Sequence, residues 1–369
     1  MILDIIRVII VLIGFFSTIY LFYKIPKLPK NNQVSCKSQI KVSILIPCRN
    51  EEANIHLLLK DLSHQTIMPH EIIVVDDDSN DHTKDVVKSF AVKLVIPSRK
   101  PETWVGKAWA IHEGIKVSTG EHYLFLDADV RLGPTALADL FCAYQGTPIS
   151  IQPHHTTKKI YEQGSLFFNM VQVAANGTAL KKPNHLGLFG PLILISKNHY
   201  ELIGGHEAIK DSIIEDVSMG QLLKEHHIPF SVFIGDEVIS FRMYGNGFKG
   251  LVEGWTKNLA SGALKTPWFR KLLVFFWIAS LTSIPIQLIR YGMNGSLSFL
   301  IFYAIFYLIW VVTLLILAPK IGSFKWMGII FYPLLMVVFL LLFTSSLLHR
   351  LFGIRVKWKE RSVQSRGKR

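Results

Sequence analysis

Cysteine and acidic residues are scarce in this chain of 369 residues. Cys36, Cys48 and Cys142 are its three cysteines, and they form neither a C-x-x-C pair nor any other metal-binding spacing. This excludes a zinc site built on cysteines, and three cysteines are too few for a disulfide framework. Asp and Glu together number 27 against 40 Lys and Arg, which gives a formal net charge of +13. The excess of base raises the question of an anionic partner.

The basic residues gather beside apolar runs. One group directly follows the first apolar run and contains no acid, and a second forms the C-terminal tail with Glu360 as its one acid. Basic residues that flank apolar spans mark the cytoplasmic side of a membrane and contact anionic lipid headgroups. Their placement predicts a membrane as partner and no nucleic acid. The first group is Lys24, Lys27, Lys30, Lys37 and Lys41, and the second is Arg350, Arg355, Lys357, Lys359, Arg361, Arg366, Lys368 and Arg369.

The hydrophobic half of the composition is concentrated near the two ends of the chain. Residues 5–23 form an apolar run long enough to cross a bilayer. Because it lacks a small-residue cleavage site, we predict an uncleaved membrane anchor over 1–23. A basic linker (24–40) leads to a predicted α/β catalytic domain over 41–263. A membrane module is predicted over 264–348 and a basic cytoplasmic tail over 349–369.

Three apolar runs, at 272–289, 297–318 and 326–348, make up the predicted membrane module. Each is long enough to span a bilayer. If the α/β domain is cytoplasmic, three crossings would place the basic tail on the opposite side, against the positive-inside tendency. We therefore expect that one run does not cross. The run 272–289 is the weakest candidate to cross, because it contains Pro285 and ends beside Arg290.

Between the apolar ends, short apolar runs alternate with helical stretches. Continuously apolar strands separated by helices indicate a parallel sheet covered on both faces, and ligands of such sheets bind at the carboxyl ends of the strands. Asn50 is a candidate N-cap for the first helix, with Glu51 and Glu52 in its first turn. The expected strands are 42–47, 71–75, 92–96 and 122–126, with helices around 82–90 and 107–117.

Asp76, Asp77 and Asp78 follow the second expected strand. Three adjacent carboxylates repel one another, so a purely structural purpose explains them poorly, although Ser79 and Asp81 would suit a turn that caps the next helix. In the functional interpretation, Asp76 or Asp77 accepts hydrogen bonds from the base or ribose of a nucleotide.

Asp127-Ala128-Asp129 follows the fourth expected strand. Alternate residues of an extended chain face the same way, so both carboxylates can reach one ligand. Mg²⁺ and Mn²⁺ favour carboxylate oxygens and bridge to a diphosphate. D-x-D is a weak pattern by itself, and its position at a strand end, after another acidic cluster at a strand end, strengthens it.

Glu215 and Asp216 precede an amphipathic stretch. Asp216 is a candidate both for the N-cap of that helix and for a general base within hydrogen-bond reach of an acceptor. The two roles are compatible, because a capping carboxylate still presents one oxygen to a site.

Taken in order, these motifs resemble those of family 2 glycosyltransferases, which share the GT-A fold, over residues 41–263. The resemblance implies an inverting, metal-dependent transfer of a sugar from a nucleotide diphosphate. It is carried by Ile46-Pro47-Cys48-Arg49-Asn50-Glu51-Glu52, Asp76-Asp77-Asp78-Ser79, Gly106-Lys107-Ala108, Asp127-Ala128-Asp129, Gly204-Gly205 and Glu215-Asp216.

The resemblance also implies roles for particular residues. Asp76 or Asp77 would contact the uridine, Asp127 the ribose or diphosphate, and Asp129 the Mg²⁺ or Mn²⁺. Asp216 would be the base, with Glu215 beside it. The residues implied in nucleotide-sugar binding are Pro47, Arg49, Glu51, Asp76, Asp77, Lys107 and Asp127.

Two features depart from the family pattern. Asp78 stands where Gly is common, and because Asp tolerates left-handed backbone the turn can survive. The Gln-x-x-Arg-Trp motif of processive members is absent, which argues for transfer of a single sugar. In its approximate place stand Trp255 and Lys257, which with Arg242 are candidate phosphate or acceptor contacts, or solvated or lipid-facing side chains.

The acceptor is the least readable part of the function. The stretches 151–155 and 241–244, with 254–257, resemble carotenoid-acid glycosyltransferases within the family, which implies UDP-glucose as donor, a lipid-soluble carotenoid carboxylate as acceptor and other pigment-pathway enzymes as partners. A membrane glycolipid synthase acting on diacylglycerol or polyprenyl phosphate is the alternative inside the family. An aspartyl-phosphate phosphatase, with Asp127 as nucleophile, and a non-enzymatic membrane protein are the alternatives outside it.

Overall fold

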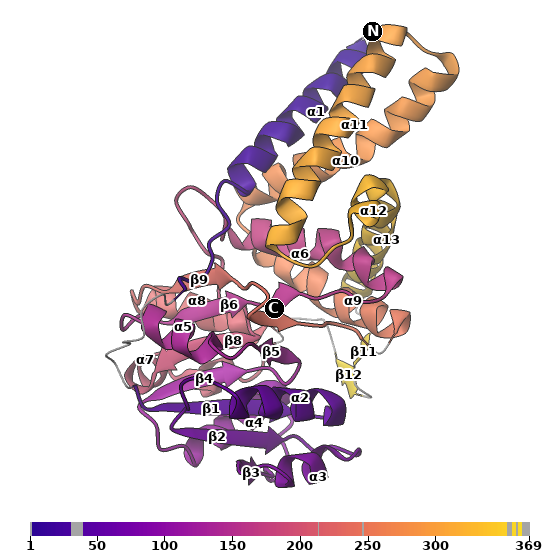
Figure 1. Ribbon diagram of the computed structural model, residues 1–369. Coiled ribbons are helices and arrows are strands. Elements are labelled where there is room, and N and C mark those ends of the chain that lie inside the picture. Colours follow the sequence, from indigo (N-terminus) through magenta and orange to yellow (C-terminus); the bar gives the residue numbers. More distant parts are fainter. Residues whose placement is uncertain are drawn as a thin grey trace. The chain divides into compact units, whose positions relative to one another are not determined.

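The computed structural model describes residues 2–30, 40–212, 214–245, 247–352, 356–358 and 361–363. The chain forms two compact units (Figure 1). The sheet unit comprises Pro26–His155 and Gly187–Met243, and the helical unit comprises Met1–Ile25, Thr156–Leu186 and Tyr244–Lys368. The predicted domain 41–263 therefore divides between the units, because its residues 156–186 and 244–263 pack with the terminal helices.

A seven-stranded sheet in the order β3-β2-β1-β4-β8-β6-β9 forms the centre of the sheet unit. β8 is antiparallel to both of its neighbours, β4 and β6, and the other neighbouring strands are parallel. A second sheet has the order β5-β10-β7. The strands are β1 (Val42–Cys48), β2 (Glu71–Asp76), β3 (Lys93–Val95), β4 (His122–Leu126), β5 (Val130–Leu132), β6 (Ile149–Gln152), β7 (His154–His155), β8 (Leu192–Ser196), β9 (Ser231–Ile234) and β10 (Ile239–Phe241).

Helices cover both faces of the large sheet, which explains why its strands are mostly apolar. Ile44 and Ile46 of β1 belong to a core with Ile55 and Leu58 of α2. Leu45, between them, belongs to the opposite core, formed with α4 and α8. The helices of this unit are α2 (Glu52–Ser63), α3 (Thr83–Lys88), α4 (Gly106–Lys116), α5 (Ala136–Ala143), α7 (Lys197–Leu202), η2 (Gly205–Ile209) and α8 (Glu215–Glu225).

The four expected strands are confirmed, and β4 has the predicted bounds. The N-cap prediction is wrong: α2 begins at Glu52 with Glu51 as its N-cap residue, and Asn50 has a φ of 50°. Asn50 instead joins two loops, because its Oδ1 accepts from the backbone N–H of Asn80 at 2.9 Å. Cys142 is disulfide-bonded, which the low cysteine count did not lead us to expect, while Cys48 is buried as a free thiol.

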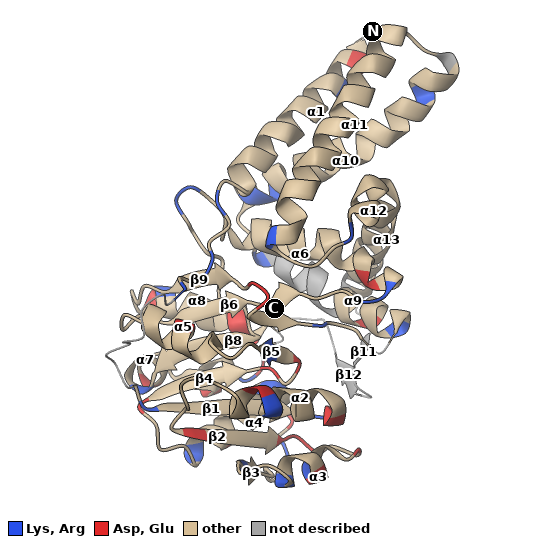
Figure 2. Cartoon of the chain, in the orientation of Figure 1, with Lys and Arg blue, Asp and Glu red and all other residues tan. Residues whose placement is uncertain are grey.

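The described residues of the helical unit include four helices long and apolar enough to cross a membrane, namely α1, α10, α11 and α13. The elements of this unit are α1 (Ile2–Leu21), η1 (Ile160–Ser165), α6 (Leu166–Asn176), α9 (Phe248–Lys265), α10 (Trp268–Asn294), α11 (Leu297–Leu317), η3 (Ala318–Lys320), α12 (Trp326–Ile330), α13 (Tyr332–Leu351), β11 (Val356–Trp358) and β12 (Arg361–Val363). Figure 2 shows that charged residues on α1, α10 and α11 lie mainly toward the helix ends.

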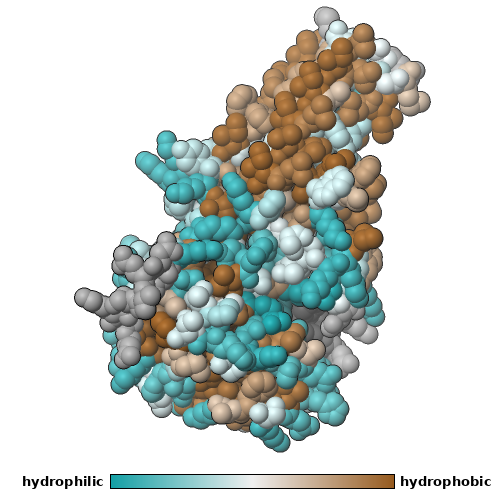
Figure 3. Space-filling view, viewed as in Figure 1, coloured by the Kyte–Doolittle hydropathy of each residue, from teal (hydrophilic) through white to brown (hydrophobic). Residues whose placement is uncertain are grey.

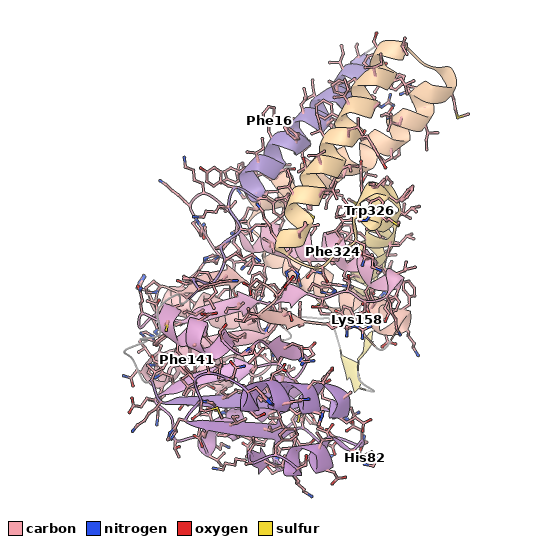
Figure 4. The ribbon with its side chains drawn as sticks, in the orientation of Figure 1. Phe16, His82, Phe141, Lys158, Phe324 and Trp326 are labelled. Carbon is pink, nitrogen blue, oxygen red and sulfur yellow. The ribbon has the colours of Figure 1, made fainter. Side chains whose placement is uncertain are left out.

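α1 and α10 pack closely along their length. At Gly14 a Cβ atom would lie 2.3 Å from Cβ of Ser280, so only glycine permits this approach. The Ser280 hydroxyl donates to the carbonyl of Val11 at 3.1 Å and accepts from the indole N–H of Trp310 on α11 at 3.2 Å. Phe16 points away from α10 and α11 (Figure 4), where 64% of its surface is exposed.

Candidate active site

The loop that follows β2 presents a buried carboxylate. Asp76 is fully buried at the end of the strand, beside Cys48 at the end of β1. Its Oδ1 accepts from the backbone N–H of Ser79 at 3.0 Å and lies 3.7 Å from Nζ of Lys84. Within the part of the chain that the structure describes, its Oδ2 has no hydrogen-bond partner. A buried carboxylate oxygen without a donor is costly, so this oxygen suits a ligand that brings a donor.

Arg49 and the two acids after Asp76 surround the same strand ends. The Arg49 guanidinium donates to the backbone carbonyl of Asp77 at 3.3 Å and lies 3.7 Å from a carboxylate oxygen of Asp78. Asp78 has a φ of 65°, which confirms the expected left-handed turn. Burial raises the pKa of Asp77 to about 6, although Arg49 and Lys100 act in the opposite direction. Asp81 has a structural role, because its Oδ1 accepts from the backbone N–H of Thr83 at the start of α3.

Lys107, in the first turn of α4, draws together acids from two other elements. Its Nζ lies 2.7 Å from Oδ1 of Asp127, after β4, and 3.3 Å from Oε1 of Glu215, at the start of α8. It also donates to the carbonyl of Gly190 at 3.3 Å. Burial lowers the pKa of Lys107, but the charges of Asp127 and Glu215 raise it further, so the ammonium stays protonated. The predicted residues Lys107, Asp127 and Glu215 therefore form one cluster.

Asp216 lies beside this cluster with both oxygens engaged. Its Oδ2 accepts from the backbone N–H of Gly190 at 2.9 Å, and its Oδ1 from that of Val217 at 2.8 Å. Asp216 is a residue of the first turn of α8, whose N-cap residue is Ile214, so the N-cap alternative is wrong. Burial and then the charge of Glu215 raise the pKa of Asp216 to about 6, although Lys107 lowers it.

The loop that contains Gly187 and Gly190, called here the glycine loop, packs against α8 beside the cluster, which the sequence did not lead us to expect. At Gly220 a Cβ would lie 2.5 Å from Cα of Gly187, and at Gly187 a Cβ would lie 2.5 Å from Cα of Val217. The loop therefore touches the helix backbone directly. A Cβ at Gly190 would lie 3.2 Å from Nζ of Lys107. The spacing of Gly187 and Gly190 just before an apolar run was the available signal.

A buried histidine was also missed as part of the site. His206 lines a small cavity together with Lys107, Glu215 and Asp216. The Tyr200 hydroxyl accepts from the backbone N–H of His206 at 2.7 Å and lies 2.9 Å from Nδ1. Burial, followed by the charge of Lys107, lowers the pKa of His206 to about 3, so the ring is neutral near pH 7.

The expectation of an extended chain through the D-x-D motif is wrong, because the backbone N–H of Val130 donates to the carbonyl of Asp127 at 3.2 Å and closes a turn. Ala128 is 4% exposed, while Asp127 and Asp129 on either side are partly exposed. Asp129 directly precedes β5, and Arg242 directly follows β10. Because Val130 of β5 is paired with Phe241 of β10, Asp129 and Arg242 adjoin the same pair.

Among the residues that the structure describes, no three His, Cys, Asp or Glu side chains gather closely enough to hold a metal ion unaided. This donor set nevertheless fits a cation that binds together with a diphosphate. Mg²⁺ is commonly bound by one or two carboxylates plus substrate phosphates, with water completing its coordination. Asp127 and Asp129 supply such a pair.

Two candidate residues, Trp255 and Lys257, lie in α9 of the helical unit. Trp255 is fully buried, stacks on Phe168 with ring centroids 4.5 Å apart, and donates from its indole N–H to the Ser165 hydroxyl at 3.3 Å. It therefore has a packing role and no exposed surface for a ligand. The side chain of Lys257 lies outside the described residues.

Known proteins are similar to this chain in sequence and in fold. The model of glycosyl transferase family 2 matches residues 43–163. The chain is 34% identical over 334 residues to a 4,4'-diaponeurosporenoate glycosyltransferase of Staphylococcus haemolyticus, with 87% of this chain and 88% of that protein covered. It is 32% identical over 335 residues to a protein of the same name from Staphylococcus aureus, with 87% of each chain covered.

Among solved structures, the chain is similar to a mannosyltransferase from Pyrobaculum calidifontis in complex with GDP-Man and Mn²⁺. The TM-score is 0.56 at 16% identity, with 95% of this chain and 99% of that chain covered. The mixed, mostly parallel sheet and this likeness define the GT-A fold. The chain belongs to glycosyl transferase family 2 and is a glycosyltransferase. This assignment decides against an aspartyl-phosphate phosphatase and against a non-enzymatic membrane protein.

Proposed function

We propose that this glycosyltransferase moves one glucose from UDP-glucose, with inversion, to the carboxylate of the C30 carotenoid acid 4,4'-diaponeurosporenoate, as in the synthesis of staphyloxanthin-type pigments. The product is a glucosyl ester. The observation that carries the proposal is the 34% identity, over 87% of the chain, to a relative named for this acceptor. The absence of a Gln-x-x-Arg-Trp motif supports the transfer of a single sugar.

The strand ends of the sheet unit provide the proposed donor site. Asp76, whose Oδ2 has no partner, and Asp77 hold the uridine, and Pro47, Arg49 and Glu51 border it. Two features support this placement: β1, β2 and β4 are neighbours in the sheet, and nucleotides bind at the carboxyl ends of such strands. The charge of Glu51 acts on Asp127, which supports one continuous site from the base to the phosphates.

The proposed diphosphate site combines carboxylates with a cation. Asp129, with Asp127 beside it, holds Mg²⁺ or Mn²⁺, which when bound supplies positive charge against the leaving diphosphate. Lys107 keeps Asp127 and Glu215 in place through its ion pairs and adds a fixed positive charge. Arg242 adjoins the strand pair beside Asp129 and is the proposed second cationic side chain at the phosphates.

The chemistry of the acceptor suggests what Asp216 does. A carboxylic acid acceptor with a pKa near that of Asp or Glu is already ionised near pH 7, so no proton must be removed from it. An acceptor oxygen forms the new bond to the anomeric carbon while the bond from that carbon to the diphosphate oxygen breaks, and the electron pair leaves with UDP. Both carboxylate oxygens of Asp216 accept hydrogen bonds, from the backbone N–H groups of Gly190 and Val217, which supports an orienting role.

A lipid-soluble acceptor fits an enzyme held at a membrane. Four helices have the length and composition to span one, and the proposed location is a cell membrane with the sheet unit in the cytoplasm. Basic residues after α1 and in the C-terminal tail support this orientation. Figure 3 shows apolar surface over the long helices of the helical unit.

The test is an assay of the purified full-length protein with UDP-glucose, Mn²⁺ and the C30 acid, read by mass spectrometry. We expect UDP and an alkali-labile hexosyl ester. The matched control is the methyl ester of the same acid, which has no ionised carboxylate and should give no product. Hexose transfer to diacylglycerol or polyprenyl phosphate, with none to the C30 acid, would contradict the proposed acceptor and favour a glycolipid synthase.

A further inference from the structure

α12 and the first half of α13 form a hairpin whose two legs contact the same short helix, η1. On the first leg, the backbone N–H of Lys325 donates to Oε1 of Gln163 at 2.8 Å. On the second leg, Val338 lies against Gly164, where a Cβ would be 3.5 Å from its Cγ1. A helix needs roughly 20 residues to cross a bilayer. The segment from Lys325 to Val338 is shorter than that, and its two ends contact neighbouring residues of η1. The segment therefore turns back toward the side from which it starts.

The tip of the hairpin lies beside the middle of α11. Tyr332, the first residue of α13, stacks on Tyr307 with ring centroids 5.3 Å apart. The Tyr307 hydroxyl donates to the carbonyl of Ile330 at 2.6 Å. Tyr307 is the central residue of α11, which runs from Leu297 to Leu317. If α11 crosses the bilayer, the tip therefore reaches its midplane.

Beyond the tip, α13 packs against α6 and α9. These two helices are too short or too polar to cross a bilayer. Phe339 packs on Phe168 of α6, with ring centroids 4.9 Å apart. One turn of helix rises about 5.4 Å, so two turns take α13 from the tip at Tyr332 to α6. Farther on, the Ser346 hydroxyl donates to the carbonyl of Thr256 in α9 at 2.6 Å. α6 and α9 are not among the four helices with the length and composition of a membrane span.

One face of the hairpin exposes apolar side chains that no described element covers. Phe331, between the two helices, is 61% exposed, and Leu334 and Leu341, seven residues apart on one side of α13, are 67% and 66% exposed. Trp326, labelled in Figure 4, is 59% exposed at the start of α12. Leu308 of α11 is likewise 64% exposed, so the occupant that fits the hairpin face is lipid hydrocarbon.

We propose that α12 and α13 form a re-entrant hairpin that inserts into one leaflet of the membrane from the side of the sheet unit. Of the four candidate spans, α1, α10 and α11 cross, and α13 does not. Two crossings after the sheet unit bring the basic tail back to the side of the sheet unit, as the positive-inside tendency requires. α10, which contains Pro285, crosses because it packs along α1. This inference rests on the proposed crossing of the α1–α10–α11 bundle.

The first test labels single introduced cysteines in sealed membrane vesicles with a maleimide that cannot cross the bilayer. Asp85→Cys reports the sheet unit, Met293→Cys the α10–α11 connection, and Phe352→Cys the residue after α13; the original side chains are 74%, 75% and 74% exposed. The unaltered chain, labelled in parallel, gives the background from Cys36, Cys48 and Cys142, which is subtracted from each variant.

We expect Phe352→Cys and Asp85→Cys to label from one side and Met293→Cys from the other. Labelling of Phe352→Cys together with Met293→Cys, opposite Asp85→Cys, would overturn the hairpin and leave the bundle intact. Labelling of Met293→Cys from the side of Asp85→Cys would overturn the crossing of α10 and α11, and the hairpin with it.

The second test measures the depth of α13 with nitroxide labels at Leu334→Cys, Leu341→Cys and Phe352→Cys in reconstituted vesicles. All three native side chains are exposed, so the labels should not disturb folding. The hairpin predicts that the ratio of oxygen to nickel-chelate accessibility is highest at 334 and falls steadily through 341 to 352. A maximum at 341, with both flanking labels shallower, is the signature of a crossing helix and would refute the proposal.

Discussion

The two units of the chain bury polar side chains in different ways. In the helical unit, buried polar groups are mostly neutral and bond to nearby neutral partners, as Ser280 does between Val11 and Trp310. In the sheet unit, Lys107, Asp127 and Glu215 bring full charges into a partly buried cluster. Neutral hydrogen-bonded pairs are cheap to bury, whereas charges are costly even when paired.

This difference is the one expected if the strand ends of the sheet unit carry the proposed active site. Asp77, Asp216 and His206 have shifted pKa values, and all three residues lie near the strand ends of the sheet unit. Perturbed titratable groups gather at functional sites because the reaction needs charges where solvent is partly excluded. The polar groups of the helical unit, by contrast, fix how helices pack.

The largest expected effect follows from Asp129→Asn. If the sheet unit uses this carboxylate to hold a cation on the diphosphate, its neutralisation should lower kcat/KM for UDP-glucose by about 10³-fold with little change in Tm. Initial rates with Mn²⁺ measure this loss. Asp85→Asn, at an exposed position of the same unit, should keep full activity; equal losses in both variants would point to misfolding.

Lys107→Met should affect both stability and activity, because Asp127 and Glu215 lose their shared cation. We expect a loss of about 2 kcal/mol, seen as a Tm lower by about 4–8 °C. Adding Glu215→Gln should restore part of the Tm by relieving repulsion. Lys116→Met, in the same helix but in an exposed pair with Glu113, should shift the Tm by less than about 1 °C. A matching small shift for Lys107→Met would show that its ion pairs contribute little.

Gly220→Ala should separate α8 from the glycine loop. The new Cβ meets the backbone at Gly187, so we expect a loss of about 1–3 kcal/mol together with reduced kcat, because Glu215 and Asp216 move with the helix. Gly250→Ala, in α9 of the helical unit, is the matched control, since its Cβ meets nothing within 4 Å. Tm and kcat are measured for both. Unchanged kcat in Gly220→Ala would mean that the position of α8 does not matter for catalysis.

The pH dependence of the Tm should reveal the raised pKa of Asp216. Its pKa rises from 3.8 to about 6 on folding, so the folded state holds this proton more tightly than the unfolded state. The resulting stability is fully present below about pH 4 and is lost as the pH rises through about 6. Asp216→Asn cannot titrate, so the Tm of the wild type should fall relative to that of the variant over this window. Parallel Tm curves would contradict the raised pKa.

The smallest effect is expected in the helical unit. Ser280→Ala removes one hydrogen bond to Val11 and one from Trp310, so we expect a loss of about 0.5–1 kcal/mol and unchanged kcat. Thermal unfolding and initial rates in detergent measure the two quantities. A large loss of kcat would break the distinction between packing in one unit and chemistry in the other.

Local patterns predicted the parts of the fold that depend on neighbouring residues. Apolar runs gave the strands β1, β2, β3 and β4, and the chemistry of Asp gave the left-handed turn at Asp78. These features follow from periodicity and backbone preference, which act over a few residues.

Contacts between residues far apart in the chain could not be predicted from local sequence patterns. Asn50 looks like an N-cap, but its side chain bonds to the backbone of Asn80 from the next loop. Nothing near Lys107 in the chain indicates that Asp127 and Glu215 will share its ammonium. The contact of Gly187 with α8 depends on Gly220, and Trp255 is buried by α6.

The central claim is that acids from separate strand ends of the sheet unit hold a nucleotide diphosphate through a cation. Isothermal titration of UDP into the full-length protein in detergent, with Mn²⁺ and then with EDTA, tests it most directly. We expect binding with Mn²⁺ and at least about tenfold weaker binding with EDTA or in Asp129→Asn. Equal affinity for UDP under all three conditions would contradict the claim.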